Sequence, residues 1–231
     1  MNMNWTDNYR KAFVLSYDDG VYQDIPLVEM LNQYGLKCTF HLNSGLMDPP
    51  AVWETNGARI ERMPPDGLPD LYRGHEIASH TLHHCDLTQL TDGELFREVI
   101  EDRQALQKLF GQEIRGFSYP YGHTDKGVKF LLDMCGIDYA RGVQSTHSFD
   151  PPGDLLEISP TCRHREEEIF DLAREFIALQ TDSPQIFLLW GHSYEFHIQQ
   201  GWKRFERFCD LIAGHGDIFY GTMGEIYNER R

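Results

Sequence analysis

Apolar and polar positions follow two different periods along this chain. Short runs of β-branched and aromatic residues are separated by longer stretches in which apolar residues recur every three or four positions. The short runs predict strands, and the longer stretches predict amphipathic helices. The predicted strands cover residues 12–17, 37–42, 75–79, 113–119, 137–141, 185–190 and 217–221. The predicted helices cover residues 24–34, 91–111, 125–135, 166–180 and 199–213, with a short helix after the last strand.

The helix over 91–111 carries the clearest local signals. Thr91 and Glu94 have the spacing of a capping box, in which each residue satisfies a backbone N–H at the start of a helix. Gly111 stands where a left-handed residue commonly ends one. One face between these ends is apolar, with Leu95, Val99, Leu106 and Leu109.

Seven strands that alternate with helices predict a parallel sheet with right-handed crossovers. In 231 residues this pattern favours an α/β fold with one domain over 1–231, a distorted (β/α) barrel of about seven parallel strands. One segment departs from the alternation. Residues 43–73 form a long, proline-rich stretch, which we expect to be a semi-rigid wall over one rim of the barrel. Trp53 and Tyr72 are expected either to offer aromatic faces to a ligand or to pin this wall to the barrel.

Charge and composition narrow the function. The chain has 36 acidic and 21 basic residues, a formal charge of −15, which argues against nucleic acid or an anionic membrane as a partner. The apolar runs are too short to cross a bilayer. The first ten residues show no leader, and five cysteines form no CxxC pair, so we expect a cytoplasmic location with reduced thiols. Self-association is left open.

Polar residues gather where several predicted strands end. Asp18 and Asp19 follow the first strand, His80 follows the third, Tyr121 the fourth and His192 the sixth. Each signal alone has an ordinary explanation, since DDG is a common turn sequence and histidines are common on surfaces. Because the carboxyl ends of parallel strands meet at one rim, we expect these side chains to form one site.

One carboxylate and two imidazoles provide a metal-binding set. His80 and His84 are four residues apart, so a helical turn would place both on one face, with His83 as a competing ligand. Together with one of the two aspartates they predict a site for one divalent ion, zinc first, with Co²⁺, Ni²⁺ and Mn²⁺ as alternatives. The second aspartate would then serve as a base, and a histidine across the site as an acid.

These residues resemble the motifs of the NodB-homology polysaccharide deacetylases, carbohydrate esterase family 4. The first motif, [ST]-[FY]-D-D-G, is similar to SYDDG at 16–20, and the second, H-[ST]-x-x-H, to HTLHH at 80–84. The third ends in P-Y-G, as at 120–122, and the last leads from a strand to a histidine, as in LLWGH at 188–192. The segments GHEIASHT and GTMGEI extend the similarity over most of the chain.

The resemblance implies a role for each residue. Asp18 would be the base that activates water on the metal, and His192 the general acid that protonates the leaving group. Asp19, His80 and His84 would be the metal ligands. The backbone N–H of Tyr121 would help hold the oxyanion. We assign Tyr121, Trp190 and Arg141 to substrate binding. The implied reaction is hydrolysis of an N-acetyl, or O-acetyl, group on a carbohydrate.

The chain departs from the family pattern in three places. Ser118 stands where the third motif normally has an arginine that contacts the base, and we expect Arg141 to replace it. No match to the fourth motif, which orients the catalytic histidine, is found, although residues 160–164 fall in that region and bring His164 or Arg163 near the site. The lack of a leader makes a cell-wall polymer a weaker expectation.

Two other functions remain open. Some relatives hydrolyse other linear or cyclic amides without a metal, and the intact set of Asp19, His80 and His84 favours the metal enzyme over this. A non-catalytic saccharide-binding protein would not require Asp18 and His192.

Overall fold

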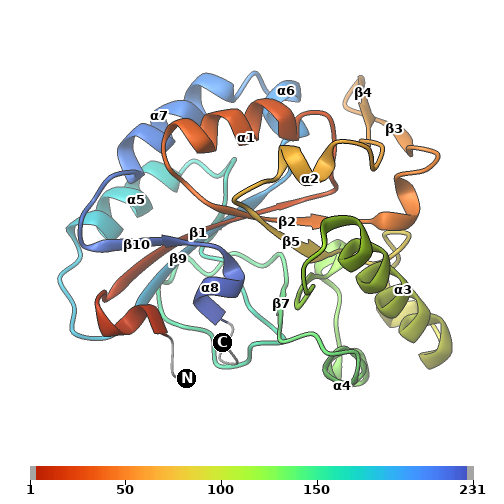
Figure 1. Ribbon diagram of the computed structural model, residues 1–231. Helices are drawn as coiled ribbons and strands as arrows, with labels where there is room; N and C mark the ends of the chain where they lie inside the picture. The colour runs from red at the N-terminus through yellow and green to blue at the C-terminus, as the bar shows by residue number, and fades with distance from the viewer. Residues whose placement is uncertain (1–3, 228–231) are drawn as a thin grey trace.

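A computed structural model describes residues 4–227 of the 231, so the first three residues of the segment inspected for a leader lie outside it. Its main sheet has eight parallel strands, in the order β7-β6-β5-β2-β1-β9-β8, with β10 also paired to β1. The sheet curls into a distorted barrel (Figure 1), as the sequence predicts. The strands are β1 (Lys11–Asp18), β2 (Cys38–Leu42), β5 (Glu76–Ser79), β6 (Gly116–Ser118), β7 (Tyr139–Arg141), β8 (Cys162–Arg163), β9 (Gln185–Gly191) and β10 (Ile218–Gly221).

The sequence did not predict β8, because two residues within the polar stretch TCRH carry no strand period. The segment around β8 nevertheless closes the barrel. Residue 158 bridges to Arg141 on β7, and residues 162–163 pair with β9. One continuous segment thus joins the two ends of the sheet.

Most of the helices cover the outside of the curved sheet, as Figure 1 shows, but the last one packs into the core inside the barrel. They are α1 (Asp24–Gln33), α2 (Leu68–Leu71), α3 (Asp92–Phe110), α4 (Lys126–Met134), α5 (Ile169–Ala178), α6 (Tyr194–Ile198), α7 (Trp202–Ile212) and α8 (Met223–Tyr227). The capping box of Thr91 and Glu94 is present in α3, and Gly111 caps its other end in the left-handed conformation. Among the described residues, no helix has both the length and the apolar character to cross a membrane.

The central strand β1 shows how the sheet determines the direction of the Asp18 side chain. Phe13, Leu15 and Tyr17 pack with residues of α1, α5 and α7 in one core. Ala12 and Val14 belong to a second core, inside the barrel. Because side chains alternate along a strand, the even series points into the barrel and continues through Ser16 to Asp18.

The stretch 43–73, expected to be a semi-rigid wall, contains regular secondary structure. It contains an antiparallel hairpin of β3 (Val52–Thr55) and β4 (Ala58–Glu61), followed by α2. The backbone at the end of the hairpin pairs with the turn after Asp19. The Met63 N–H donates to the Gly20 carbonyl, at 2.9 Å, and Arg62 forms an antiparallel β-bridge with Val21. The hairpin is therefore fastened directly to the rim that carries the two aspartates.

Tyr72 has the second of the two roles expected for it. Its side chain is buried, packs on Phe40 with ring centroids 4.6 Å apart, and donates a hydrogen bond of 2.6 Å to Asp24. The expectation that Tyr72 offers a face to a ligand is wrong, because its ring lies in the core beneath the wall.

Candidate active site and metal centre

Asp18 lies at the end of β1 inside the barrel, and its carboxylate is held by residues of other strands. Arg141 of β7 donates to both of its oxygens, at 2.5 and 2.6 Å, and Ser118 of β6 donates to one of them, at 3.1 Å. Burial by itself would raise the pKa of Asp18, but Arg141 and the neighbouring histidines outweigh it and hold that pKa well below its ordinary value. Asp18 is therefore ionised at neutral pH.

Arg141 is the cation that the sequence expected to replace the family arginine at the base. Its assignment to substrate binding, however, is wrong. The side chain is 0% exposed, and its other donors bond to Ser16 Oγ and the Gly142 carbonyl. No donor group of Arg141 faces the cavity, so its role is to position Asp18.

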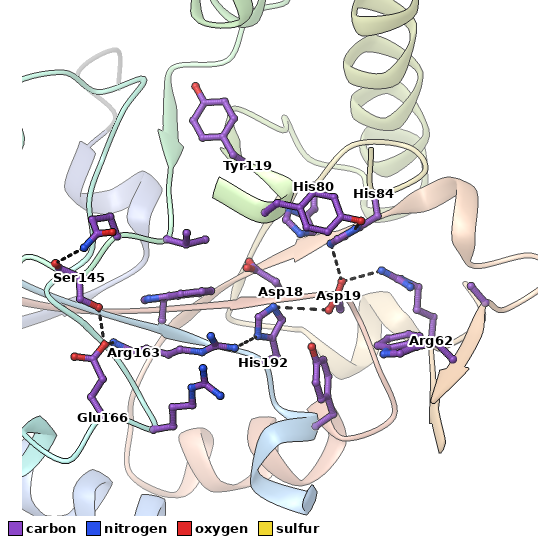
Figure 2. A pocket seen from close by; sticks show the side chains of 18 of the residues that line it. Asp18, Asp19, Arg62, His80, His84, Tyr119, Ser145, Arg163, Glu166 and His192 are labelled. Carbon is purple, nitrogen blue, oxygen red and sulfur yellow. Dashed lines mark hydrogen bonds and ion pairs between the residues drawn. The ribbon is translucent and has the colours of Figure 1, made fainter. Parts of the chain in front are cut away.

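Asp19, His80 and His84 come together on the other side of the same rim. Their ligand atoms all lie within 4.8 Å of one another. Asp19 has a φ of 88°, which turns its carboxylate away from the direction that Asp18 takes. His84 reaches Asp19 from a loop, with Nε2 3.7 Å from Oδ1, as Figure 2 shows.

The segment that joins the two histidines is a loop rather than the helical turn that the spacing suggested. Thr81 and His84 have positive φ values of 66° and 57°, which no α-helix contains. His83, the competing ligand, hydrogen-bonds Glu98 of α3 through Nδ1 at 2.7 Å. His83 therefore stands outside the metal-binding group.

The donor set fits a divalent ion. His80 Nδ1 is hydrogen-bonded to the carbonyl and hydroxyl of Ser118, at 2.8 and 2.7 Å, which leaves Nε2 as its free donor atom. Burial lowers the pKa of His80 to about 4 and also lowers that of His84, so both imidazoles are neutral at pH 7. Neutral imidazole is the form that binds a metal.

His192 faces this group from the end of β9. Its Nε2 lies 3.9 Å from Asp19 Oδ2, and its Nδ1 lies 3.1 Å from Arg163 and 3.7 Å from Glu195. Burial alone would lower the pKa of His192, but Glu195 and the two aspartates raise it above its ordinary value. Burial would raise the pKa of Glu195, but His192, His164 and Arg163 outweigh it and lower that pKa to about 2.

Glu195 and Arg163 contact His192, as the fourth family motif, which this sequence lacks, would be expected to do. They form an ion pair of 2.5 Å next to the imidazole, and Arg163 lies over the ring of Trp190. The sequence predicted that His164 or Arg163 would lie near the site, and Arg163 contacts His192. His164 is buried, with its Nδ1 3.0 Å from the Tyr17 hydroxyl and its Nε2 3.3 Å from Glu195.

A cavity of about 1070 Å³ opens over these residues. Trp53, Tyr194 and Val52 line one part of it, and Ser145, His147 and Glu166 line another. Tyr121 lies beside the histidines, 60% exposed, with its hydroxyl 3.3 Å from His84 Nδ1. Trp190 is nearly buried but contributes to the lining, so a role for it in substrate binding stays a prediction.

The family model described as polysaccharide deacetylase matches residues 6–140, more than half of the chain. The chain belongs to the polysaccharide deacetylase family.

Known proteins of related sequence carry deacetylase names. Chitin deacetylase 1 from Cryptococcus neoformans var. grubii is 28% identical over 129 residues, which are 55% of this chain and 25% of that protein. Peptidoglycan-N-acetylglucosamine deacetylase from Bacillus cereus is 25% identical over 130 residues, 52% of this chain and 42% of the relative. The chain thus spans only part of the length of these relatives.

Solved structures share the polysaccharide deacetylase fold. One from Mycobacterium smegmatis, itself ascribed to the polysaccharide deacetylases, aligns with a TM-score of 0.70 at 15% identity, over 97% of this chain and 91% of that one. The family 4 carbohydrate esterase from Streptomyces lividans, in complex with acetate, aligns with a TM-score of 0.58 at 17% identity, over 94% and 95%.

Sequence reasoning about this member of the polysaccharide deacetylase family missed Arg62. This side chain, at the end of the β3–β4 hairpin, donates to Asp19 Oδ1 at 2.8 Å. It comes from the proline-rich stretch, where no period or motif singles out one residue. Glu195 had a weak signal, since it lies three residues after His192 and so one helical turn away.

Proposed function

We propose that this chain removes acetyl groups from a saccharide, using a divalent ion held by Asp19, His80 and His84. The observation that carries the proposal is the contrast between the two adjacent aspartates. Asp18 is ionised and held by Arg141, whereas Asp19 turns toward two neutral imidazoles. A base beside a carboxylate–imidazole metal site, with a histidine opposite, is the arrangement that amide or ester hydrolysis requires.

A divalent ion bound there would polarise the acetyl carbonyl and lower the pKa of a water molecule. The remaining steps fall to the chain itself. Asp18 accepts a proton from the attacking water, and Arg141 keeps the carboxylate oriented and charged. Ser118 fixes the distance between the base and His80, because its hydroxyl contacts both.

His192 donates a proton to the leaving nitrogen or oxygen. Its Nε2 lies on the side of Asp19, and its Nδ1 is oriented by Arg163 and Glu195. The exposed position of Tyr121 at the cavity supports its assignment to the acetyl oxygen and to substrate binding. Related deacetylases are named for chitin and for N-acetylglucosamine of peptidoglycan, so we propose an N-acetylated saccharide as the first substrate class.

Acetate release tests this function directly. Purified protein, stripped of metal and then reloaded with zinc, cobalt, nickel or manganese, is assayed on chitin oligosaccharides and on O-acetylated xylan, and its metal content is measured on the same sample. We expect release of acetate that is lost with a chelator and restored by one of the ions. Metal-loaded protein that releases no acetate from any acetylated saccharide would contradict the proposal.

A second candidate function is hydrolysis of a non-carbohydrate amide without a metal. Arg62 favours it, because its guanidinium already neutralises Asp19. Activity on such an amide that survives complete removal of metal would support this candidate over the first.

A further inference from the structure

Arg62 is a cation placed against the residue that we propose as the carboxylate ligand of the metal. Its Nη2 lies 2.8 Å from Asp19 Oδ1 and 3.0 Å from the side-chain oxygen of Asn43. Oδ1 is also the oxygen that faces His84, at 3.7 Å. The guanidinium and a bound ion would therefore compete for the same carboxylate.

Two independent contacts fix the position of Arg62, one through its backbone and one through its guanidinium. The backbone of the hairpin end is bonded to the turn at Gly20 and Val21. The guanidinium lies over the ring of Trp53, 4.8 Å from its centroid. The side chain is 6% exposed, and its Nε has no partner among the described residues. A long cationic side chain that is packed in this way cannot move freely into solvent.

Asn43 connects Arg62 to the loop that carries the histidines. Its amide nitrogen donates to the carbonyls of His80 and Thr81, and its oxygen accepts from Arg62. Arg62 is thus part of the framework around the metal-binding group, and it is the member of that framework that carries a positive charge.

The charges of the site balance without any ion. Asp18 is paired with Arg141 and Asp19 with Arg62, so two guanidinium groups already face the two buried carboxylates. A divalent ion would add two positive charges within a few ångströms of a guanidinium. Charges in a buried site are screened less than charges that face water, so the repulsion between the guanidinium and the ion is strong.

We infer that Arg62 weakens the binding of the divalent ion at Asp19, His80 and His84 and makes that ion exchangeable. This inference rests on the metal site of the proposed function. It differs from two other roles. If Arg62 only pinned the hairpin, its charge would have no effect on metal affinity. If it held Asp19 in the geometry of a ligand, its removal would weaken binding.

Zinc titration of metal-stripped protein, by calorimetry or by competition with a chromophoric chelator, separates these roles. Arg62→Met removes the charge and keeps the length of the side chain, and we expect zinc to bind about tenfold more tightly and to dissociate more slowly. Arg62→Lys keeps the charge and should bind zinc as the wild type does. Arg165→Met is the matched control, because Arg165 lines the same cavity but its nearest ion-pair partner is Glu195, at 3.7 Å. It should change the zinc affinity by less than about threefold.

Thermal unfolding provides a second readout. Arg62→Met removes the guanidinium that pairs with Asp19, so we expect a lower Tm without metal and a larger rise in Tm on addition of zinc than in the wild type. Arg62→Gln replaces Arg62→Met if the latter does not fold. Unchanged or weaker zinc binding in the folded, charge-removing variant overturns the inference.

Asp19→Asn separates this failure from a failure of the proposed function. If the wild type binds zinc and Asp19→Asn loses it, the metal site stands whatever Arg62 does. If the wild type binds no zinc at a defined stoichiometry, or if Asp19→Asn binds zinc as the wild type does, both the metal-dependent function and the role of Arg62 are wrong.

Discussion

Adjacent aspartates in this protein are held by two different kinds of structure. We name the two halves of the site after the roles proposed for these aspartates. The base half consists of Asp18, Arg141 and Ser118, all of which lie on strands of the barrel. The metal half includes Asp19 and His84, which lie beyond strand ends with positive φ, and Arg62, which follows a hairpin outside the barrel. The sheet therefore fixes the base half, whereas loops and their hydrogen bonds fix the metal half.

Because of this difference, we expect substitutions to have different effects in the two halves. A residue on a central strand is held by its neighbours on both sides, so a change there is transmitted to the core. A residue on a loop is held by a few local contacts, and its position depends on them. We expect substitutions in the base half to affect catalysis and folding, and substitutions in the metal half to affect mainly affinity.

The largest effect is expected at Asp18. Asp18→Asn removes the base but leaves the three proposed metal ligands in place, so kcat should fall by ~10²–10⁴ while zinc content stays at the wild-type level. Acetate release under saturating substrate and metal analysis of the same preparation measure both quantities. Loss of zinc in Asp18→Asn, with zinc retained in Asp19→Asn, would mean that the roles of the two aspartates are reversed.

Arg141→Met tests how firmly the sheet holds the base half. The change leaves the buried carboxylate of Asp18 without its cation, which typically costs 3–5 kcal/mol and should lower Tm by roughly 10 °C. Arg62→Met is the matched comparison from the loop half, because it removes the same charge from the neighbouring aspartate. We expect the smaller loss of Tm for Arg62→Met. Equal losses would show that the two halves are held equally firmly.

Asp24 links the segment after β9 to the 43–73 stretch and gives stability an unusual pH dependence. It accepts hydrogen bonds from Ser193, next to His192, and from Tyr72 of the wall. Burial raises the pKa of Asp24 to about 7, although these hydroxyls oppose the shift. The unfolded chain releases this proton at about pH 4, so the folded protein binds more protons between pH 4 and pH 7. This contribution to stability therefore decreases as the pH rises through that window.

Asp24→Asn removes this contribution. Between about pH 5 and about pH 7.5 the wild type should lose about 2 kcal/mol of unfolding free energy relative to Asp24→Asn. Urea unfolding at the two pH values measures the difference. Asp70→Asn, at a residue whose side chain is 81% exposed, is the control and should show the slope of the wild type. A parallel slope in Asp24→Asn would mean that Asp24 stays ionised in the folded protein.

The smallest effect is expected at Trp53. If its ring contacts a sugar, Trp53→Ala should raise KM roughly fivefold with little change in kcat. Because the guanidinium of Arg62 packs on the same ring, zinc affinity has to be measured in this variant as well. A lower Tm with unchanged KM would instead identify Trp53 as a residue that pins the hairpin to the rim.

The sequence alone determined the alternation of strands and helices, and with it the barrel. It also identified the residues of the site that stand at strand ends. The period of an extended strand and the parallel sheet place Asp18, His80 and His192 at one rim, and both are local properties of the chain. The motif resemblance then connected these residues to the family, which the match over residues 6–140 establishes.

The departure from the family motif at Ser118 suggested Arg141 as the partner of Asp18, but only the tertiary structure decided how the charges of the site are paired. Arg141 is 123 residues away from Asp18 and Arg62 is 43 away from Asp19, and no local pattern links the members of either pair. The hydrophobic period specifies which face of a strand is buried, but it does not specify which cation a buried carboxylate meets. That choice depends on the strand order of the sheet for Arg141, and on the docking of the hairpin against the turn at Gly20 for Arg62.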